Sequence, residues 1–427
     1  MHDPPQRFAA RIDRLGRIRA KLLALAKRHR TPLYVYDADE AIANLTRFSR
    51  AFARAEVPVS IFYAMKSNPY PGLLATICAN GHNLDASSAP ELRAALAAGP
   101  QAIVLTGPAK GREALELALQ HRDQVVIHLD SVRELSMVND LARGLGCQVR
   151  CGVRIHTSEQ SGWGKFGIPI EELPHFFRRA RRHPHIDMRG IHFHGGTHPS
   201  PQRVLKTLRM LGEQFALPSA QIPVQALAFV DIGGGVPPEV FQGSYPWNRR
   251  QVMSFASRTE LLQRILAGDF QPSFEIAEVV PVETFATKIG QAFARHVHCH
   301  NPAIRLWAEP GKFISHSVMH FLLGVAETKG NEVVIVDGGT NMVGWEKYEY
   351  FDYVPIFNLT RFAPHREVPT LVYGNLCTPH DLWGYYVRGR ALRHGDLLCL
   401  PYQGAYTYTL AQAFIRGVPP VVELANQ

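Results

Sequence analysis

The stretch Val59-Ser60-Ile61-Phe62-Tyr63-Ala64-Met65-Lys66-Ser67-Asn68-Pro69 is the one around which the chain is organised. An apolar run from Val59 to Met65 leads directly into Lys66, and a turn signal follows. A lysine at the mouth of a buried strand is a candidate amine nucleophile. Desolvation and nearby cations lower the pKa of such an ammonium group, and the free amine attacks carbonyl carbon to form a Schiff base. An ordinary solvated lysine at a strand end fits the same pattern, so the choice between a reactive and a solvated Lys66 depends on the rest of the sequence.

Length and composition indicate a globular protein of two domains. The chain has 427 residues, of which 46% are hydrophobic and 19% charged, and single cores stop growing below that length. It contains no run of about 18 apolar residues, so we expect no membrane span. The net charge of +9 comes largely from Arg7 to Arg30 and from Arg178 to Arg182. Neither stretch carries a nucleic-acid motif, so both predict solvated helix faces, with attraction of an anionic cofactor or substrate as the alternative.

The cysteines indicate a reducing compartment, and we expect a cytoplasmic protein. They are scattered and form no CxxC pair: Cys78, Cys147, Cys151, Cys299, Cys377 and Cys399. The basic N-terminal stretch weakly resembles a transit peptide. Its apolar residues nevertheless repeat at helical spacing from Phe8 to Leu25, which favours a structural helix that packs on the body of the protein.

Short apolar runs alternate with helical segments over the first two thirds of the chain. One helix shows its limits in the sequence, because Ser88 to Glu91 forms a capping box and Gly99 a stop signal. Alternation of this kind favours a (β/α)₈ barrel, with a doubly wound sheet as the alternative. The expected strands are Val59 to Tyr63, Asn83 to Ala86, Ala102 to Leu105, Val125 to Leu129, Val149 to Ile155, Gly190 to His194, Leu227 to Ile232 and Ile304 to Ala308.

The predicted domains are an N-terminal helix over 1–30, the barrel over 31–311 and an all-β domain over 312–427. Beyond Gly311 the sequence turns to Val-rich and Tyr-rich strands separated by turn signals such as Lys329-Gly330-Asn331 and His394-Gly395-Asp396. Within the barrel, Val236 to His300 is too long for one simple connection, and Gly243 to Trp247 predicts a surface excursion.

Reactive residues follow the predicted strands repeatedly, and barrels of this class carry their chemistry on the loops after the strands. The residues concerned are Lys66, Asp85, Arg154, His194 to Thr197, Gly233 to Gly235 and Glu309 to Gly311. If Lys66 holds a cofactor with an aldehyde, a ring nitrogen and a phosphate, a carboxylate such as Glu309 suits the ring nitrogen. Glycine backbone amides and hydroxyl groups suit the phosphate, and His194 suits the face of the ring.

His192-Phe193-His194 also admits a metal site. Alternate residues of a strand point to one side, and an HxH pair on a barrel strand can hold zinc. A metal hydrolase of that kind needs further His and Asp ligands on later strands. The later strand ends offer glycines and Glu309 instead, so the sequence favours the cofactor and predicts no metal.

Six motifs, in order, resemble those of the ornithine/diaminopimelate decarboxylase family. They are Tyr63 to Asn68, His192 to Thr197, Asp231 to Gly235, Ala308 to Gly311, Cys377 to Asp381 and Gly404 to Tyr406. The resemblance runs from about Thr31 to the C-terminal region. It implies an alanine-racemase-like barrel followed by a β-domain, pyridoxal 5'-phosphate as the cofactor, and decarboxylation of an amino acid.

The resemblance also implies roles for individual residues. Lys66 is the residue that holds pyridoxal phosphate, His194 stacks on its ring and Glu309 faces its nitrogen. The cofactor site further includes Asp85, Arg154, Thr197, Gly234, Gly235, Gly311, Lys312 and Tyr406. A head-to-tail homodimer is expected, in which Cys377, Thr378 and Asp381 of one subunit reach the other subunit's site, and Cys377 returns a proton to Cα after carbon dioxide leaves.

Several positions depart from the family pattern and bear on the substrate. Diaminopimelate decarboxylases carry an acidic residue directly after the cysteine, where this chain has Thr378, and the arginine after Glu-Pro-Gly is Lys312 here. Phe414 to Gly417 lacks the usual asparagine. Lys347, Arg388 and Arg390 add positive charge. We therefore expect an acylated or acidic distal end, as in the citrate-conjugated diamino acids of siderophore pathways.

Other substrates and activities remain open. Diaminopimelate, ornithine and lysine decarboxylases are the nearest alternatives. A racemase on the same barrel would need a tyrosine base and an arginine at the ring nitrogen, where this chain has Glu309. A catalytically silent relative would be expected to lose Lys66 or Cys377, and both are present.

Overall fold

A computed structural model describes most of the chain as two units. The described residues are 6–157, 164–196, 200–217, 222–238, 243–244, 263–264, 267, 279–330, 333–344, 352–378 and 381–424. One unit comprises 41–238 and 279–314, and the other comprises 1–40, 239–278 and 315–427. No helix among the described residues is both long enough and apolar enough to cross a bilayer.

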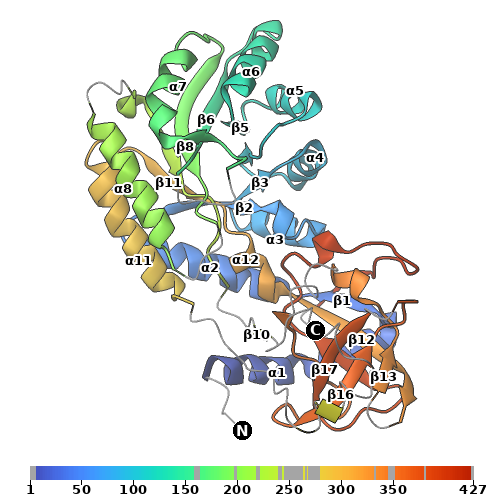
Figure 1. The fold of residues 1–427 in the computed structure, drawn as a ribbon. Helices are drawn as coiled ribbons and strands as arrows, with labels where there is room; N and C mark the ends of the chain where they lie inside the picture. Colours follow the sequence, from blue (N-terminus) through green and yellow to red (C-terminus); the bar gives the residue numbers. More distant parts are fainter. Residues whose placement is uncertain are drawn as a thin grey trace. The chain divides into compact units, whose positions relative to one another are not determined.

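The first unit is a closed barrel of eight parallel strands (Figure 1). Each strand pairs with the next along the chain, and the last pairs with the first, so the sheet has no free edge and is not a doubly wound sheet. Each strand overlaps one of the eight predicted runs, although β8 begins four residues before its run. The strands are β2 (Val59–Ala64), β3 (Asn83–Ala86), β4 (Ile103–Leu105), β5 (Val125–Leu129), β6 (Val149–His156), β8 (Ile186–Phe193), β9 (Phe229–Asp231) and β11 (Arg305–Ala308). A two-residue strand, β7 (Ile168–Pro169), pairs with β6.

Helices alternate with these strands and lie outside the barrel (Figure 1). They are α2 (Ala38–Arg54), α3 (Pro71–Ala79), α4 (Ala89–Ala98), α5 (Arg112–Gln120), α6 (Val132–Gly144), α7 (Leu173–Ala180), α8 (Gln202–Ala216) and α11 (Val282–Phe293). The predicted limits of α4 are confirmed. The hydroxyl of Ser88 accepts the Glu91 N–H at 3.3 Å, and Gly99 ends the helix in the left-handed conformation with φ 71°.

The second unit is built on a six-stranded β-barrel. The closed ring runs β13 (Val333–Val336), β16 (Glu367–Tyr373), β17 (Leu382–Arg388), β15 (Phe357–Asn358), β18 (Leu397–Leu400) and β12 (Met319–Lys329), and β12 pairs with β13 to close it. Two further strands extend the sheet beyond β12, namely β1 (Leu33–Tyr36) and β19 (Val421–Glu423). A separate two-stranded pair joins β10 (Gly243–Ser244) to β14 (Asp352–Tyr353); Tyr245 to Trp247 of the predicted excursion lie outside the described residues.

The basic N-terminal stretch is a helix, α1 (Gln6–His29), as its apolar spacing predicts. Its inner face buries Ile12, Leu15 and Leu22 against a core of this second unit that includes Leu33 and Leu322. The basic residues therefore line a helix that contributes to a hydrophobic core.

The boundaries of the units differ from the sequence prediction at the N-terminal side. Residues 31–40 were expected to begin the barrel, whereas β1 pairs antiparallel with β12 and parallel with β19 in the second unit. All four residues of β1 are buried. A short, fully apolar run carries no periodicity that distinguishes a barrel strand from a strand of another sheet, so sequence alone does not assign it. The second boundary falls after Ile314, three residues beyond the expected 311.

Candidate active site

Lys66 and Asp85 form an ion pair at the carboxyl ends of adjacent strands. Strand β2 ends at Ala64 and continues into a short 3₁₀ turn, Met65–Ser67, that carries Lys66, while Asp85 lies in β3. The Nζ atom of Lys66 lies 2.7 Å from Oδ2 of Asp85, and the lysine side chain is 42% exposed although that of Asp85 is fully buried. Burial, together with the charge of Glu309, raises the pKa of Asp85 to about 6 against the opposing effect of Lys66. The amine is thus accessible, and its partner carboxylate is not.

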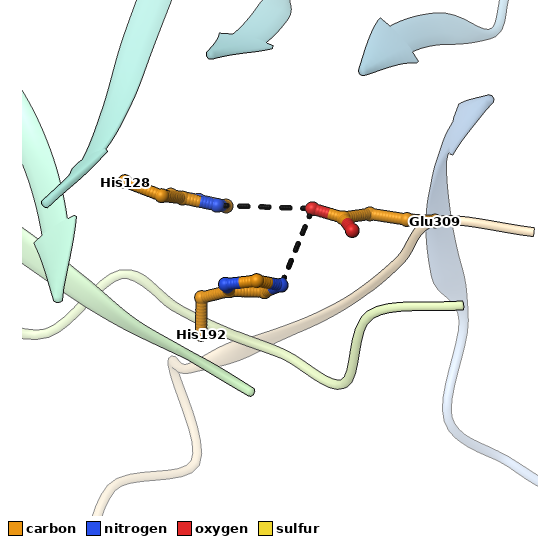
Figure 2. A group of neighbouring side chains, drawn as sticks. All are labelled: His128, His192 and Glu309. Carbon is orange, nitrogen blue, oxygen red and sulfur yellow. Dashed lines mark ion pairs between the residues drawn. The ribbon is translucent and has the colours of Figure 1, made fainter. Parts of the chain in front are cut away.

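Glu309 follows β11, the strand on the other side of β2, and its carboxylate lies inside the barrel. One oxygen, Oε1, lies 3.4 Å from Nε2 of His192 and 3.7 Å from Nδ1 of His128. The hydroxyl of Thr106 is 3.4 Å from the same oxygen. Figure 2 shows both imidazole rings directed at this one oxygen. Neither of these two ion pairs involves the second oxygen, Oε2.

His194 and the glycines after β9 form the next part of the site. The N–H of Gly234 donates to Nδ1 of His194 at 3.0 Å, so the neutral ring carries its proton on Nε2. Burial, with Lys66 as the next cause, lowers the pKa of His194 to about 3, and the ring is neutral at physiological pH. A Cβ atom at Gly234 would lie 2.5 Å from the carbonyl oxygen of Glu309, so only glycine lets this loop run against the Glu309 backbone.

Gly235, Gly311 and Lys312 lie in the same unit, at the ends of β9 and β11. Gly235 has φ 88°, in the left-handed region that favours glycine. A Cβ atom at Gly311 would lie 3.0 Å from that of Ser67, which places the turn after Glu309 against the turn that carries Lys66. Lys312 opens a single helical turn, Lys312–Ser315. Thr197 lies outside the described residues.

Arg154 lies in β6, in register with His192 of β8, and is 7% exposed. Its guanidinium carbon lies 4.3 Å from the centre of the Phe166 ring. Burial lowers the pKa of this guanidinium, and the negative charge of Glu309 is the largest opposing effect. Arg154 therefore adds positive charge to the barrel interior near the carboxylates.

Sequence analysis overlooked two polar residues of the barrel interior, Thr106 and His128, and gave no role to a third, Asp231, although it opens one of the six motifs. Oδ1 of Asp231 accepts the Gly233 N–H at 2.8 Å, and burial, followed by the charge of Glu309, raises the pKa of Asp231 well above its ordinary value. His128 and Asp231 stand within predicted apolar runs, and a lone polar residue in such a run was the available signal.

The two histidines of the HxH motif, which were weighed as a metal site and not favoured, contact different residues. His194 bonds to Gly234, whereas His192 faces Glu309. Among the described residues, the group with the spacing of metal ligands is His128, His192 and Glu309, whose ligand atoms lie within 4.8 Å of one another. The HxH spacing suggested His192 and His194 as a pair, whereas the barrel brings His192 together with His128.

The predicted substrate residues and Tyr406 belong to the second unit. Cys377 is exposed and Thr378 is partly exposed. The Asp381 carboxylate is 1% exposed, with Oδ1 accepting the Thr340 N–H at 2.7 Å and Oδ2 the Leu376 N–H at 2.8 Å. Asp381 therefore anchors the backbone of its own unit. Tyr406 has φ 53°, and its part in a cofactor site stays a prediction.

The barrel residues fit pyridoxal phosphate, as their donor set shows. The half-exposed side chain of Lys66 stands beside the buried carboxylate of Asp85, a second buried carboxylate belongs to Glu309, and a glycine-rich turn follows β9, in which the Gly233 and Gly234 N–H groups bond to Asp231 and His194. Such a cofactor needs an amine for its aldehyde, a carboxylate for its ring nitrogen and N–H donors for its phosphate. Each is present at the carboxyl end of the barrel strands.

Comparison with known proteins agrees with this fit. A family model described as "Pyridoxal-dependent decarboxylase, pyridoxal binding domain" matches residues 39–316. Diaminopimelate decarboxylase of Bacillus subtilis is 23% identical over 94% of this chain and 88% of its own length. The L-glutamyl-[BtrI acyl-carrier protein] decarboxylase of Niallia circulans is 23% identical over 96% of this chain and 91% of its own.

The crystal structure of diaminopimelate decarboxylase from M. jannaschii shows the same fold. It superposes with a TM-score of 0.76 at 21% identity, covering 94% of this chain and 88% of that one. The family match spans more than half of the present chain, from α2 to the end of the barrel. The chain therefore belongs to the pyridoxal-dependent decarboxylases, a family of carboxy-lyases whose cofactor is pyridoxal phosphate.

Proposed function

We propose that the protein removes the α-carboxylate of an amino acid, with Lys66 holding the cofactor and Glu309 facing its ring nitrogen. The observation that carries this assignment is the accessible Lys66 amine, 2.7 Å from Asp85 and one strand away from the buried Glu309 carboxylate. When bound, pyridoxal phosphate supplies an electron sink for the electron pair left on Cα.

Each side chain has a task that follows from its surroundings. Oδ2 of Asp85 orients Lys66 and, with a pKa of about 6, takes a proton from Nζ. An anionic Glu309 keeps a proton on the ring nitrogen, which strengthens electron withdrawal. Neutral His194 offers a flat face to the ring.

The phosphate group is assigned to backbone amides and polar side chains around the glycine turn. The proposed contacts are Thr197, Gly234, Gly235, Gly311, Lys312 and Tyr406. Lys312 supplies a point charge, not the planar fork of an arginine. Arg154 contributes to cofactor binding through its positive charge in the barrel interior.

Glu309 favours decarboxylation over racemisation. A carboxylate at the ring nitrogen keeps that nitrogen protonated and the electron sink strong, which suits loss of carbon dioxide. A racemase would instead have an arginine there. Cys377 is assigned the return of a proton to Cα.

We further propose that the distal end of the substrate is acylated or conjugated, as in a citrate-linked diamino acid. Two observations support this: Thr378 stands where diaminopimelate decarboxylases carry an acid, and one relative acts on a glutamyl group attached to a carrier protein. Arg388 and Asp381 are not assigned to the distal end of the substrate, because both already have partners within the chain. Arg388 pairs with Glu367 at 2.6 Å, and both oxygens of Asp381 accept backbone N–H groups. Lys347 lies outside the described residues.

A cytoplasmic homodimer completes the proposal. The cysteines are all free, which agrees with a reducing compartment. In the homodimer, Cys377 of one subunit serves the Lys66 of its partner.

The test is carbon dioxide release from a panel of amino acids by the wild type and by Lys66→Ala. The panel holds ornithine, lysine, diaminopimelate, arginine, their citryl and glutamyl conjugates, and glutamate attached to a carrier protein. Fast release from a conjugate, abolished by Lys66→Ala, is expected. Far faster release from a free diamino acid would refute the conjugated substrate and leave the decarboxylase intact. Inversion at Cα without release of gas would refute the decarboxylase.

A further inference from the structure

The two histidines beneath Glu309 form a buried pair with no hydrogen-bond partner. His128 of β5 and His192 of β8 are both 0% exposed, and their rings stack with centroids 4.6 Å apart and planes 18° from parallel. All four of their ring nitrogens lack a hydrogen bond. Burying a polar group without a partner costs roughly 1 to 3 kcal/mol, so a pair of apolar residues would stabilise the barrel better. The presence of two histidines here therefore calls for a functional explanation.

A single oxygen of Glu309 lies close to both rings. Oε1 lies 3.4 Å from Nε2 of His192 and 3.7 Å from Nδ1 of His128 (Figure 2). These separations are slightly longer than ordinary hydrogen bonds. A shift of less than 1 Å in the carboxylate would complete either of them.

Thr106 does not remove the need for this donor. Its hydroxyl makes a short hydrogen bond to Oδ1 of Asp85 and lies 3.4 Å from Oε1 of Glu309. A hydroxyl has one proton to give, and its closer acceptor is Asp85. The Oε1 atom of Glu309 is thus left for an imidazole N–H.

Two contacts hold the His128 ring in place: a hydrogen bond to its backbone and an aromatic ring beside it. The buried ammonium of Lys110 donates to the carbonyl oxygen of His128 at 2.6 Å. The ring of Phe229 stacks on Trp307 with centroids 3.7 Å apart and has its centroid 5.7 Å from that of the His128 ring. The imidazoles therefore cannot swing away to another partner without repacking the barrel.

Both rings are neutral, which decides what they can do for the carboxylate. Burial lowers the pKa of each ring well below its ordinary value, with the neighbouring positive charges adding to this effect. A neutral imidazole donates one N–H without bringing a positive charge. It orients the carboxylate and leaves the negative charge uncompensated for a cationic partner on the other oxygen.

We propose that His192, backed by its stacked partner His128, is a positioning residue that donates its Nε2–H to Oε1 of Glu309 and so keeps Oε2 anionic and aimed at the cofactor ring nitrogen. This inference deepens the proposed function and depends on Glu309 facing that nitrogen. Loss of the donor removes a hydrogen bond that favours the anionic carboxylate. The proton shared between Oε2 and the ring nitrogen then moves toward the oxygen, and the electron sink weakens.

The same three residues have the ligand types of a zinc site, which is the competing assignment. The near-parallel stack opposes it, because stacked rings direct their nitrogen lone pairs side by side. In a metal site, the lone pairs converge on one point. Zinc binding is accordingly an outcome that the experiment has to detect.

The experiment compares His192→Leu, which removes the donor, with His192→Gln, whose amide N–H can take the place of Nε2–H. The holoenzyme is prepared with a cofactor isotopically labelled at its ring nitrogen, and NMR reports the protonation of that nitrogen. We expect the His192→Leu resonance to move toward that of a neutral pyridine, and cofactor affinity and kcat to fall by about tenfold or more, with little change in KM. His192→Gln should restore most of each loss. An unmoved resonance in His192→Leu refutes the proposal.

Two controls separate the possible failures. Val104→Ala opens a cavity in the same barrel core without touching a polar group, so it should lower stability and leave the resonance unchanged. Glu309→Gln must shift the resonance. If it does not, the assignment of Glu309 in the proposed function fails; if it does while His192→Leu does not, only the present inference fails. One zinc ion per chain in the purified wild type, lost in His192→Gln, would also overturn it.

Discussion

The two carboxylate oxygens of Asp85 accept hydrogen bonds from different residues, one from the ammonium group of Lys66 and the other from the hydroxyl of Thr106. Asp85 is fully buried, and its pKa of about 6 lies above the ordinary 3.8 because burial and Glu309 oppose its ionisation more than Lys66 favours it. The folded protein therefore binds this proton more tightly than the unfolded chain does. The stability that Asp85 contributes is fully present below about pH 4 and is lost as the pH rises through about 6.

Asp85→Asn should remove this part of the pH dependence. Between about pH 4 and 6, one proton contributes a slope of at most about 1.4 kcal/mol per pH unit, so the free energy of unfolding of the wild type should fall relative to that of the variant. Urea unfolding of the cofactor-free proteins at several pH values measures it. Glu113→Gln removes an exposed carboxylate and serves as the control. Parallel profiles for wild type and Asp85→Asn would contradict the assignment.

At this scale, the sequence identified the residues whose position follows from the barrel. Lys66, Asp85 and Glu309 end three adjacent parallel strands, so their meeting follows from strand order alone. His128 was missed because a run of apolar residues does not reveal which positions face inward in a barrel of unknown register. Asp381 was taken as a substrate contact, and its two backbone hydrogen bonds depend on loop geometry that the motif does not specify.

Strands β8 and β9 approach so closely that one residue has no room for a side chain. A Cβ atom at Gly190 would lie 2.3 Å from the ring of Phe229 on the neighbouring strand, and that ring in turn stacks on Trp307. The glycine thus lets a large aromatic residue fill the barrel interior beside His128.

Gly190→Ala should therefore destabilise the protein by about 1 to 3 kcal/mol, the usual cost of overpacking a core. The matched control is Gly144→Ala at the end of α6, where a Cβ atom would meet nothing within 4 Å. That change should be neutral or stabilise by up to about 1 kcal/mol. Urea unfolding compares the two. Equal effects would show that glycine at 190 is not held there by Phe229.

The eight barrel strands were predictable because most of them are apolar runs bounded by turn or helix signals, and α4 was predictable because its caps are local. The assignment of β1 to the other sheet was not. Its partners, β12 and β19, lie hundreds of residues further along the chain, and pairing at that distance leaves no local trace. The family, fold class, enzyme class and cofactor expected from the six motifs are confirmed by the match over 39–316 and by the fold.

At the scale of the whole molecule, the predicted catalytic residues lie in different units. Lys66 and Glu309 belong to the barrel, and Cys377 belongs to the other unit. The proposed homodimer pairs the barrel of one subunit with Cys377 of its partner, as in a symmetric interface in which the same contact occurs twice.

Mixing Lys66→Ala with Cys377→Ala should then restore activity. Random reassortment gives hybrids in half of the dimers, and each hybrid has one intact site, so activity should reach about a quarter of the wild-type value. Carbon dioxide release after dissociation and reassociation of the mixed subunits measures it. Each variant carried alone through the same treatment is the control. No recovery in a mixture proven to contain hybrids would place Cys377 and Lys66 of one site in the same subunit.

The pairing of β1 has a consequence for how the protein is made. Leu33–Tyr36 leaves the ribosome before every barrel strand, whereas both of its partner strands are translated after the barrel. All eight barrel strands emerge before β12 and β19, with 239–278 of the other unit between β9 and β11, so their ring can close during translation. During this time Leu33–Tyr36 has neither of its partner strands. An apolar strand with unpaired backbone groups readily pairs with strands of other nascent chains. The interval between translation of β1 and of β19 is therefore when a chaperone that binds the N-terminal segment would most improve yield.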